Sequence, residues 1–356
     1  HSGDNSVYFN RYGKYPELGA YQSKDSKYYN WYHFTNHPDE YRSWWGIKTL
    51  PAFNQNDPEF LNFITGKDGV IQKWLDLGAF GFRLDVIDEL NDAFLDRIYQ
   101  SLKEKNPNHI MIGEVWEDAS NKISYGHRRK YFNGRQCDSV MNYPLKNAII
   151  NYLTQGNALA LQRQMRQLVN NYPKIVLDNL MNILGTHDTE RIISVFAPEH
   201  PKTRTEQANY HMPPVNYYLA LSMVKLASAL QYTLPGVPCI YYGDEIGMEG
   251  FKDPFCRKTF AWNNMNSELL SWYQKLGEIR KDEAYLDGIY LEEFISKDIF
   301  SFSRSKGDYK IMTIVNNGDA DYYLDIEKGY DLLRDKHVSG QFCVTANSVS
   351  IIKIHC

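Results

Sequence analysis

Hydrophobic residues recur along the middle of the chain with two different spacings. In residues 58–78 they lie three or four positions apart up to Gly78, which predicts a helix with a glycine stop. The segment that follows, AFGFRLDV at residues 79–86, is a short apolar run typical of a buried strand. Arg83 and Asp85 interrupt that run two positions apart. Because strand side chains alternate between faces, this cation and this carboxylate share one face of a strand that otherwise belongs in the core.

The same alternation of apolar runs and amphipathic segments continues toward the C-terminus. Strands are predicted at residues 79–85, 110–114, 138–141, 182–187 and 237–242. Helices are predicted between them, near residues 91–105, 145–171 and 213–232. Strands that alternate with helices form parallel sheets, and polar residues at the C-terminal ends of such strands are typical of an α/β fold, the (β/α)8 TIM barrel. The five predicted strands, however, cannot close a barrel of eight.

The pattern differs at both ends of the chain. Residues 1–57 are polar, rich in tyrosine and glycine, and follow no regular period, which predicts an irregular excursion. Beyond residue 283, short alternating strands and the turn sequences SKGD and NNGD predict a C-terminal antiparallel β-sandwich. The sequence therefore predicts three parts: the excursion at 1–57, the C-terminal portion of a barrel at 58–282 and the sandwich domain at 283–356.

Composition narrows the class of function. A net charge of −4 gives no basic footprint for nucleic acid. No apolar run reaches the roughly 18 residues of a membrane span. The five cysteines are widely spaced without a CxxC pair, so they form neither a disulfide framework nor a zinc site. Aromatic residues make up 14% of the chain, and many lie in polar segments such as residues 28–34 and 41–45. These rings suit either stacking on sugars or packing within the loops.

Three carboxylates stand at the ends of predicted strands, namely Asp85, Glu114 and Asp188. A single one would be explained as a cap or a loop-fixing residue. Three of them, accompanied by Arg83 and His187, are costly to gather because like charges repel. Active sites accept that cost where the chemistry needs one carboxyl ionised and another protonated. Two such groups roughly 5 Å apart suit glycoside hydrolysis with retention.

The motifs at these positions resemble those of the α-amylase superfamily of glycoside hydrolases. FRLD, GEVWED and GTHDTERI carry Asp85, Glu114 and Asp188 and follow the order of the family. Weaker similarities to its neopullulanase, cyclomaltodextrinase and maltogenic-amylase branch surround them, in WWGIKTLPAFNQNDPE, DSVMNYP, PGVPCIYYGDEIGMEG and KDPFCRKTFAW. The resemblance extends over essentially the whole chain, including the closing β domain, and implies an α-glucan as substrate.

The resemblance implies a role for each matching residue. Asp85 would be the nucleophile that forms a covalent glycosyl intermediate, and Arg83 would hold it ionised through charge-assisted hydrogen bonding. Glu114 would be the general acid and then the base, kept protonated at first by apolar neighbours such as Trp116. Asp188 would bind the sugar hydroxyls as the ring distorts.

Further residues match positions around the cleavage point. His187 would bind the same sugar ring. Trp116 and Arg191 would lie on the leaving-group side, and Asp253 and Arg257 on the non-reducing side. The last four each have a structural alternative. Trp116 would then be a packing residue, Arg191 an ion-pair partner at a helix start, and Asp253 with Arg257 a loop ion pair.

The N-terminus departs from the family pattern. His1 resembles the final residue of the motif D-x-x-x-N-H at the end of the third barrel strand, where the histidine binds sugar. The rest of that motif and the first three strands do not appear in the sequence, so we expect the chain to be the C-terminal part of a longer protein; the alternative is a shorter protein with a different fold. Residues 3–5 (GDN) suit either a structural calcium ion, as in family members, or an ordinary turn. No metal ligand is assigned, and the chemistry requires no metal.

Two other functions use the same features. A non-catalytic carbohydrate-binding descendant of an amylase would have no reason to keep all three acids together with Arg83. A transglycosylase would use the same residues as a hydrolase and differ in how water competes at the acceptor side. The sequence decides neither the preference between α-1,4 and α-1,6 linkages nor the oligomeric state, for which a homodimer is one option.

Overall fold

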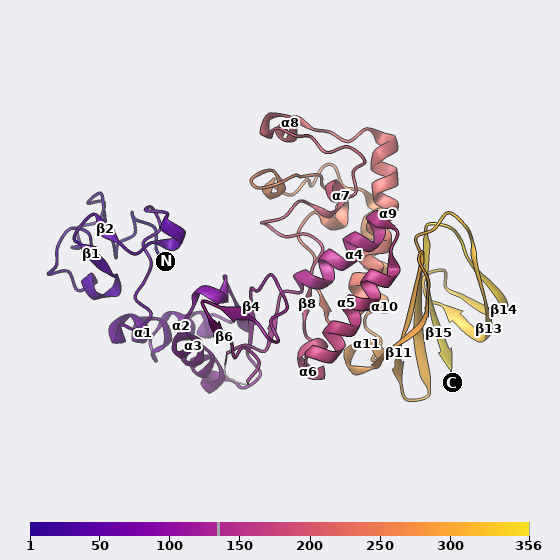
Figure 1. Cartoon of the computed structure of the whole chain (residues 1–356), viewed down its shortest axis with the longest axis horizontal. Helices are drawn as coiled ribbons and strands as arrows, with labels where there is room; N and C mark the ends of the chain where they lie inside the picture. The colour runs from indigo at the N-terminus through magenta and orange to yellow at the C-terminus, as the bar shows by residue number, and fades with distance from the viewer. Residues whose placement is uncertain (134–135, 356) are drawn as a thin grey trace. The chain divides into compact units, whose positions relative to one another are not determined.

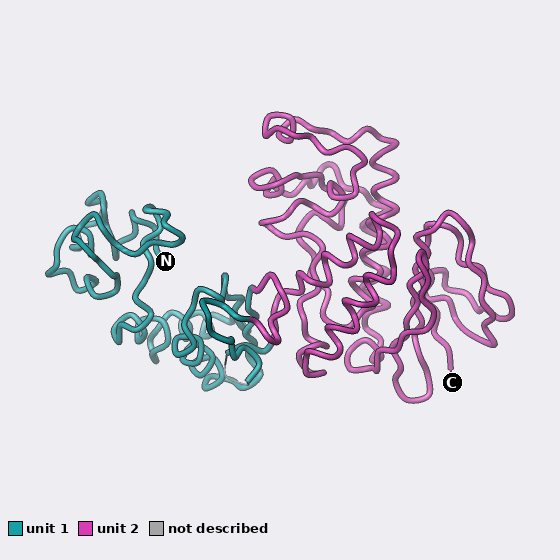
Figure 2. The backbone as a smooth tube through the Cα atoms, viewed as in Figure 1, with its two compact units in different colours: residues 1–114, 123–138 teal, residues 115–122, 139–356 magenta. Residues whose placement is uncertain are grey.

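The structure, a computed structural model, describes residues 1–133 and 136–355. The chain divides into two compact units, which Figure 2 colours separately. Unit 1 comprises residues 1–114 and 123–138, and unit 2 comprises residues 115–122 and 139–356. Figure 1 labels the helices and strands of both.

The first part of unit 1 contains only short elements: η1 (Tyr29–Trp31), β1 (Phe34–Asn36), β2 (Glu40–Tyr41) and η2 (Trp44–Gly46). Aromatic side chains form its interior. Phe9 is fully buried, with its ring 4.9 Å from that of Tyr32 and 4.8 Å from that of Tyr41. Tyr28 and Trp31 are buried as well, in edge-to-face contact. Most of the aromatic residues of this segment therefore pack the loops, which is the structural alternative considered from the sequence.

The rest of unit 1 is helical and carries one pair of parallel strands. Its elements are α1 (Pro58–Thr65), α2 (Val70–Asp76), β3 (Gly81–Leu84), η3 (Ile87–Glu89), α3 (Asp92–Lys105), β4 (Ile110–Gly113) and the β5 (Ile123–Ser124)–β6 (His127–Arg128) hairpin. Side chains cap two of the helices. The Asp57 carboxylate accepts a hydrogen bond from the Phe60 N–H, and the Asn91 side chain accepts one from the Phe94 N–H.

The prediction of one continuous helix over residues 58–78 is wrong, because two helices occupy that range. The interruption lies between Gly66 and Gly69, where a Cβ atom on Gly69 would come within 2.9 Å of the Gly66 backbone nitrogen. Glycine also weakens a helix interior by about 1 kcal/mol relative to alanine.

Unit 2 contains the remaining parallel strands, all of them short: β7 (Ser139–Val140), β8 (Met181–Asn182) and β9 (Val237–Pro238). A parallel bridge joins Met141 to Met181, and β8 pairs in parallel with β9. Side-chain amides extend this limited backbone pairing. The Gln231 amide donates to the backbone carbonyls of Asn182 and Cys239, so that a buried helix residue holds the ends of two strands together.

Helices surround these strands in unit 2. They are α4 (Tyr143–Gln155), α5 (Ala158–Asn171), α6 (Lys174–Leu177), α7 (Ile192–Val195), α8 (Arg204–Asn209), α9 (Pro214–Thr233), η4 (Asp244–Ile246), η5 (Phe255–Arg257), α10 (Ser267–Ile279) and α11 (Ala284–Asp287). The helical stretches predicted over 145–171 are the two helices α4 and α5. Gly156 ends the first of them in a left-handed conformation with φ 59°, which glycine adopts without strain.

The C-terminal part of unit 2 is an antiparallel sheet, as predicted. Its strands are β10 (Ile289–Ile295), β11 (Ile299–Lys306), β12 (Tyr309–Asn316), β13 (Tyr322–Asp331), β14 (Lys336–Val344) and β15 (Ser348–His355). Hydrogen bonds join all six in the order β10-β11-β12-β15-β13-β14. Ile314 of β12 and Val344 of β14 share one buried cluster although their strands are not paired, so the sheet folds over its own apolar face.

The sheet is joined to the helices of its own unit. Figure 1 shows α5 and α9 beside it, and both helices contact its strands. The Tyr152 hydroxyl at the end of α4 donates to the backbone carbonyl of Asp298 at 2.7 Å, and the Asn317 amide donates to the backbone carbonyls of Tyr152 and Leu153. Arg166 of α5 forms an ion pair with Glu292 of β10. The sheet and these helices are therefore one packed structure.

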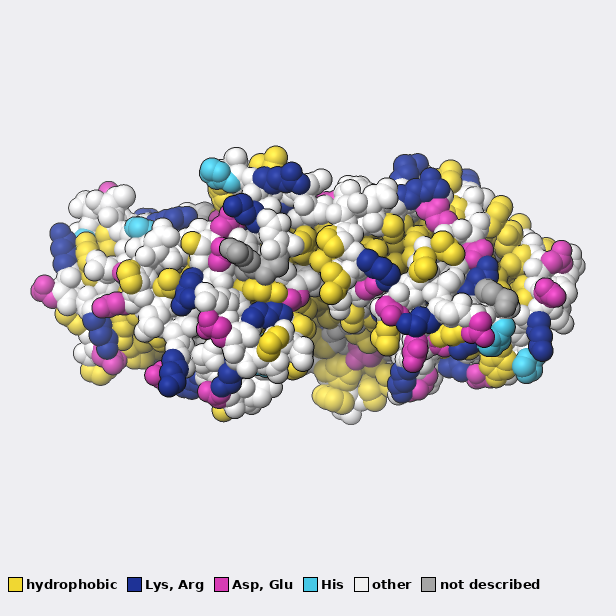
Figure 3. Space-filling view, turned by 90° about the horizontal axis from the view of Figure 1, so that it is seen from below, with side chains coloured by type: hydrophobic (Ala, Val, Ile, Leu, Met, Phe, Trp, Pro, Cys, Tyr) yellow, Lys and Arg dark blue, Asp and Glu magenta, His cyan; other side chains and the backbone are white. Residues whose placement is uncertain are grey.

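Charged side chains of both signs are mixed on the surface. On the face drawn in Figure 3, the described residues form no continuous basic area. Among the described helices, none has the length and apolar character needed to cross a membrane. Of the five cysteines, Cys137, Cys239, Cys256 and Cys343 are free thiols, and Cys356 lies outside the described residues.

The packing of the sheet leads to a stability prediction. Replacing the fully buried Ile314 with alanine should destabilise the sheet by about 2–5 kcal/mol, because the cavity left behind adds to the lost burial. Hydrogen–deuterium exchange of peptides covering β12 and β15 should accelerate accordingly. Leu291→Ala on β10, where the side chain is 48% exposed, is the matched control and should leave exchange nearly unchanged. Equal effects of the two substitutions would contradict the assignment of this core.

Candidate active site

The pairing of β3 with β4 determines where two of the predicted carboxylates lie. The strands are parallel, with Arg83 opposite Ile112 and Leu84 opposite Gly113. Asp85 and Glu114 are the next residues in this register, and the Glu114 N–H still donates to the Leu84 carbonyl at 3.0 Å. Residues at the same level of neighbouring parallel strands point to the same face. The sequence thus brings both carboxylates to one edge of the strand pair, level with each other.

A single guanidinium group contacts both carboxylates. Arg83 Nη1 donates to Asp85 Oδ1 at 2.6 Å, and Arg83 Nη2 lies 2.8 Å from Glu114 Oε2. The second contact is an ion pair. The Asp85 side chain is 61% exposed, whereas that of Glu114 is only 2% exposed. Arg83 therefore links an accessible carboxylate to a buried one, as expected for Asp85 from the sequence.

The backbone just after Asp85 adds a contact that the sequence did not reveal. Val86 adopts a left-handed conformation with φ 32°, which is strained for a β-branched residue. In this conformation its N–H donates to Glu114 Oε2 at 2.9 Å. Nothing in the residue type at position 86 signals this role, because the contact is made by the main chain. Gly113 supports the arrangement, since a Cβ atom there would meet the Ile87 side chain at 2.3 Å.

The surroundings of Glu114 differ from the apolar environment expected from its sequence neighbours. Its carboxylate faces the guanidinium of Arg83 and accepts the backbone N–H of Val86. Both contacts stabilise a negative charge. Both contacts are made by Oε2, so Glu114 lies in a more polar setting than its sequence neighbours suggested.

His1 lies in the same unit and beside an aromatic ring. Its imidazole is 5.2 Å from the Trp44 ring, and both residues line a cavity of about 90 Å3 together with Trp45, Gln55 and Glu89. The Trp45 indole donates to the Glu89 carboxylate at 3.1 Å and is otherwise largely exposed. Trp45 also stacks on Trp44, with the ring centroids 5.1 Å apart, and the remaining surface of its ring is accessible to a ligand.

In unit 2, Asp188 is at the centre of a second charged group. His187 Nε2 lies 3.1 Å from Asp188 Oδ2, and Arg257 Nη2 donates to Asp188 Oδ1 at 3.1 Å. The same guanidinium contacts Asp253 through Nε at 2.7 Å. Four residues predicted to bind substrate thus adjoin one another, and the loop ion pair considered for Asp253 and Arg257 does exist. The thiol of Cys256 also contacts the His187 carbonyl at 3.3 Å, which the sequence did not indicate.

The substrate-binding role expected for Arg191 does not fit its position in unit 2. Its side chain is fully buried against the rings of Tyr241 and Tyr242, whose centroids lie 4.7 and 4.8 Å from the guanidinium carbon. It donates to the Tyr242 carbonyl at 2.6 Å and to Asp244 Oδ1 at 3.2 Å. Arg191 is the N-cap residue of α7, so the ion-pair alternative describes it correctly. No substrate could reach this guanidinium without unpacking both tyrosines.

Asp244, the ion-pair partner of Arg191, is a described carboxylate whose pKa is raised by burial. Burial raises the pKa of Asp244 to about 7, and the attraction of Arg191 only partly offsets that effect. The pair connects two loops, because the Arg191 N–H also donates to the Gly250 carbonyl at 2.9 Å. The loop that carries His187 and Asp188 is thereby fastened to the loop that follows β9.

Trp116 packs face to face against Tyr143 within unit 2. The ring centroids are 4.2 Å apart and the planes differ by 11°. The indole remains 44% exposed, so packing accounts for one part of its surface and leaves another accessible. Trp116 therefore packs against Tyr143, as the structural alternative predicted, and also presents accessible ring surface.

Residues 3–5 do not present an open set of oxygen ligands. Asp4 is buried, and its carboxylate lies 3.5 Å from Arg11 and accepts the Tyr12 hydroxyl. Asn10 uses its amide to fix the loop, donating to the carbonyls of Tyr15 and Glu17. Within residues 1–133 and 136–355 there is no cluster of three or more His, Cys, Asp or Glu side chains that would hold a metal. Asp4 thus uses its carboxylate within the loop, and the structural calcium ion considered from the sequence stays a prediction.

Comparison with known proteins places this geometry in a family. The sequence profile of the α-amylase catalytic domain matches residues 1–284. The amylopullulanase of Thermoanaerobacter thermohydrosulfuricus is 33% identical over 371 residues, covering 90% of this chain and 24% of that protein. The cyclomaltodextrinase of Thermoanaerobacter pseudethanolicus is 28% identical over 362 residues, covering 93% of this chain and 55% of that protein. The chain thus spans about a quarter and about half of the length of these relatives.

Solved structures agree with the sequence comparison at the level of the fold. The ligand-free cyclic α-maltosyl-(1→6)-maltose hydrolase of Arthrobacter globiformis matches with a TM-score of 0.78 and 24% identity, covering 99% of this chain and 73% of that one. The debranching enzyme of Nostoc punctiforme matches with a TM-score of 0.79 and 23% identity, covering 99% and 74%. The family predicted from the motifs around Asp85, Glu114 and Asp188 is confirmed: this chain belongs to the α-amylase family of TIM-barrel enzymes with a C-terminal antiparallel sheet.

Proposed function

We propose that the full-length protein is a retaining glycoside hydrolase that cleaves α-1,4-glucosidic bonds, with α-1,6 bonds as a second linkage to be tested. The observation that carries the proposal is the contact of one guanidinium, that of Arg83, with both Asp85 and Glu114. Two carboxyls that share one cation are close together, and a close pair is the arrangement of retaining rather than inverting glycosidases. Membership of the α-amylase family and relatives named amylopullulanase and cyclomaltodextrinase support the substrate class.

In the first step, Asp85 attacks the anomeric carbon of an α-glucoside. The bond from that carbon to the leaving oxygen breaks, and the leaving oxygen takes the proton of Glu114. The products are a covalent glycosyl ester at Asp85, a free sugar hydroxyl and an ionised Glu114. The exposure of Asp85 supports its role as the attacking group, and the contact with Arg83 supports its charge before attack.

In the second step, Glu114 acts as a base. It takes a proton from water while the water oxygen attacks the anomeric carbon, and the ester bond to Asp85 breaks. The negative charge thus moves from Asp85 to Glu114 and back, and both groups contact the same cation. The hydrogen bond from Val86 suits Glu114 in its ionised form, which is the form in the intermediate. The proton that Glu114 takes from water in this step restores the acid for the next cycle.

We assign Asp188 and His187 to the sugar ring at the cleavage point, and Asp253 and Arg257 to the non-reducing side. This assignment rests on the family resemblance of the segments that carry them. The contacts within unit 2 support a shared task, because Arg257 links Asp188 to Asp253. His1 and Trp116 are assigned to sugar contacts on the same basis. Arg191 is left out because it is buried.

We also infer the place of the chain in the family fold. Strands β3, β4, β7, β8 and β9 would be the fourth to eighth strands of a (β/α)8 barrel, residues 1–57 the excursion after the third strand, and the folded-over sheet a β-sandwich domain. Parallel pairing of β3 with β4 and of β8 with β9 supports this order. The homodimer considered from the sequence stays a prediction, which light scattering of the full-length protein would test.

The direct test of the proposed function is product analysis of the full-length protein on cyclodextrin, pullulan and soluble starch. Retention predicts that the first sugars released carry the α configuration, which proton NMR detects before mutarotation. Release of β-anomers would exclude the two-step mechanism. Transfer of glucosyl units to added maltose in place of hydrolysis would identify a transglycosylase. Binding without any cleavage would identify the non-catalytic alternative.

The nucleophile role predicts the effect of Asp85→Asn. The amide cannot form the ester, so turnover of soluble starch should fall by orders of magnitude while circular dichroism stays unchanged. The matched control is Asp68→Asn, because Asp68 is an exposed residue between α1 and α2. Turnover near the wild-type value in Asp85→Asn would rule out the assignment.

The acid role predicts a selective effect of Glu114→Gln. Without a proton donor the variant should lose activity on glucans, whose leaving group needs protonation. It should still form the glycosyl intermediate from an α-glucosyl fluoride, because fluoride leaves without a proton. Asp85→Asn is the control, since it should lose both reactions. Loss of both reactions in Glu114→Gln as well would contradict the acid role.

A further inference from the structure

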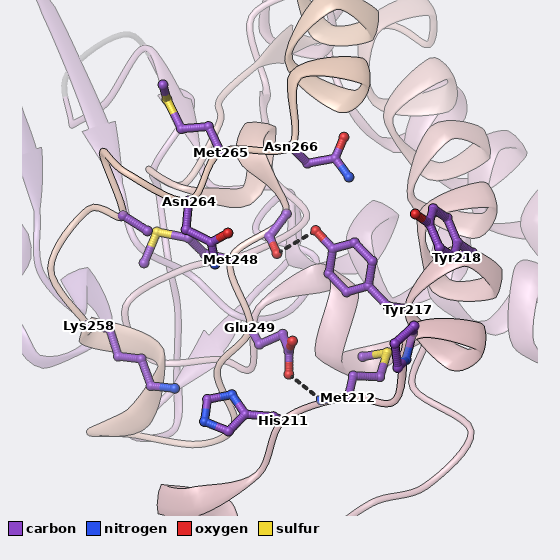
Figure 4. A pocket seen from close by; sticks show the side chains of 13 residues that line it. His211, Met212, Tyr217, Tyr218, Met248, Glu249, Lys258, Asn264, Met265 and Asn266 are labelled. Carbon is purple, nitrogen blue, oxygen red and sulfur yellow. Dashed lines mark hydrogen bonds between the residues drawn. The ribbon is translucent and has the colours of Figure 1, made fainter.

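Unit 2 contains a cavity of about 610 Å3 that none of the proposed catalytic residues lines. It lies between the start of α9 and the loop that follows β9, and Figure 4 shows its side chains. The segments that form it are residues 211–218, 247–249 and 258–266. A volume of this size is in the range of roughly 300–1,000 Å3 that small-molecule sites occupy in proteins.

One wall of the cavity is fixed by internal contacts. The Tyr217 hydroxyl donates to the Gly247 carbonyl at 3.1 Å, a contact that Figure 4 marks with a dashed line. Gly247 has φ 74°, and a Cβ atom there would come within 2.1 Å of the Tyr217 hydroxyl. Glu249 Oε2 accepts the Met212 N–H at 2.9 Å. The wall is therefore formed before any ligand binds, which reduces the entropy lost on binding.

Two polar groups that line the cavity have no hydrogen-bond or ion-pair partner within the described part of the chain. The Lys258 ammonium and the Asn264 side-chain amide make no hydrogen bond or ion pair to a described residue. The Tyr218 ring is 65% exposed. These groups offer an apolar face, hydrogen-bond donors and an amide oxygen to a ligand in the cavity.

The charges and the apolar groups of the cavity indicate the chemistry of its ligand. Lys258 and Glu249 are the lining residues of opposite charge, so they give the cavity little preference for an anion or a cation. Tyrosine rings and the side chains of Met212, Met248 and Met265 supply apolar contact area. A neutral molecule with apolar faces and hydroxyl edges satisfies both features, and a sugar ring has this character.

The cavity is connected through the sequence to the charged group around Asp188. Arg257 donates to Asp188, and the next residue, Lys258, lines the cavity. One loop therefore carries contacts to both places. A glucan held in the cavity would keep its chain close to the residues that we assign to the non-reducing side.

We propose that this cavity is a second α-glucan-binding site, in which Tyr218 stacks on a glucosyl ring and Asn264 and Lys258 bind its hydroxyls. The proposal rests on the proposed function, because the substrate class comes from it. The site would retain long glucans beside the residues that we assign to the non-reducing side. Substrates too short to span both places would not use it.

The test uses the full-length protein and the double variant Tyr218→Ala/Asn264→Ala. In the inactive Asp85→Asn background, calorimetric titration with maltoheptaose should show two sites, and the double variant should retain one. In the active background, the KM for soluble starch should rise about three- to tenfold, the effect of losing one aromatic contact and its hydrogen bonds. The KM and kcat for maltotriose should not change.

Val215→Ala is the matched control, because Val215 is 67% exposed on the first turn of the same helix and does not line the cavity. An unchanged number of maltoheptaose sites and an unchanged KM for starch in the double variant would overturn the proposal. Equal losses on starch and maltotriose would also overturn it, since they would place Tyr218 and Asn264 in the main cleft. If the wild-type protein cleaves no glucan, the proposed function fails, and maltoheptaose binding to the double variant still decides whether this site exists.

Discussion

The contact of one guanidinium with two carboxylates at the ends of paired strands is the interaction on which the candidate site depends. Asp85 and Glu114 would repel each other if both were charged without a cation between them. Arg83 removes that repulsion because it reaches both, at 2.6 and 2.8 Å. Its position requires that β3 and β4 pair in this register, since a shift by one residue would turn one of the carboxylates to the opposite face. The register of β3 and β4 therefore determines whether Arg83 can neutralise both carboxylates.

Arginine serves different purposes at three places in the chain. Arg83 is partly exposed and contacts carboxylates that we assign to the reaction. Arg257 is more exposed and links Asp188 to Asp253. Arg191 is fully buried, and its ion pair with Asp244 fastens two loops together. Such a buried pair is costly to desolvate, which suits a residue that determines loop conformation better than one that binds substrate.

Side-chain hydrogen bonds add to the backbone pairing of the short strands in unit 2. β8 and β9 contain two residues each, so backbone pairing alone holds them weakly. The amide of Gln231 bonds to backbone carbonyls at both strands, and the Asn142 amide donates to Asn182 at 2.9 Å. These buried polar groups are satisfied by one another, which avoids the free-energy cost of an unpaired amide. The same strands lead into the segments that carry Asp188 and Tyr242.

The sequence by itself determined the family, the order of strands and helices, and the pairing of Arg83 with Asp85, because those properties follow from local periodicity and short motifs. It did not reveal the helix break at Gly66–Gly69, since apolar spacing continues across it. Only the tertiary structure decided the environment of Glu114, the role of the Val86 N–H and the burial of Arg191. These three features depend on atoms that folding brings together from distant parts of the chain, or on backbone conformation. The identity of a single residue determines neither the contacts nor the conformation.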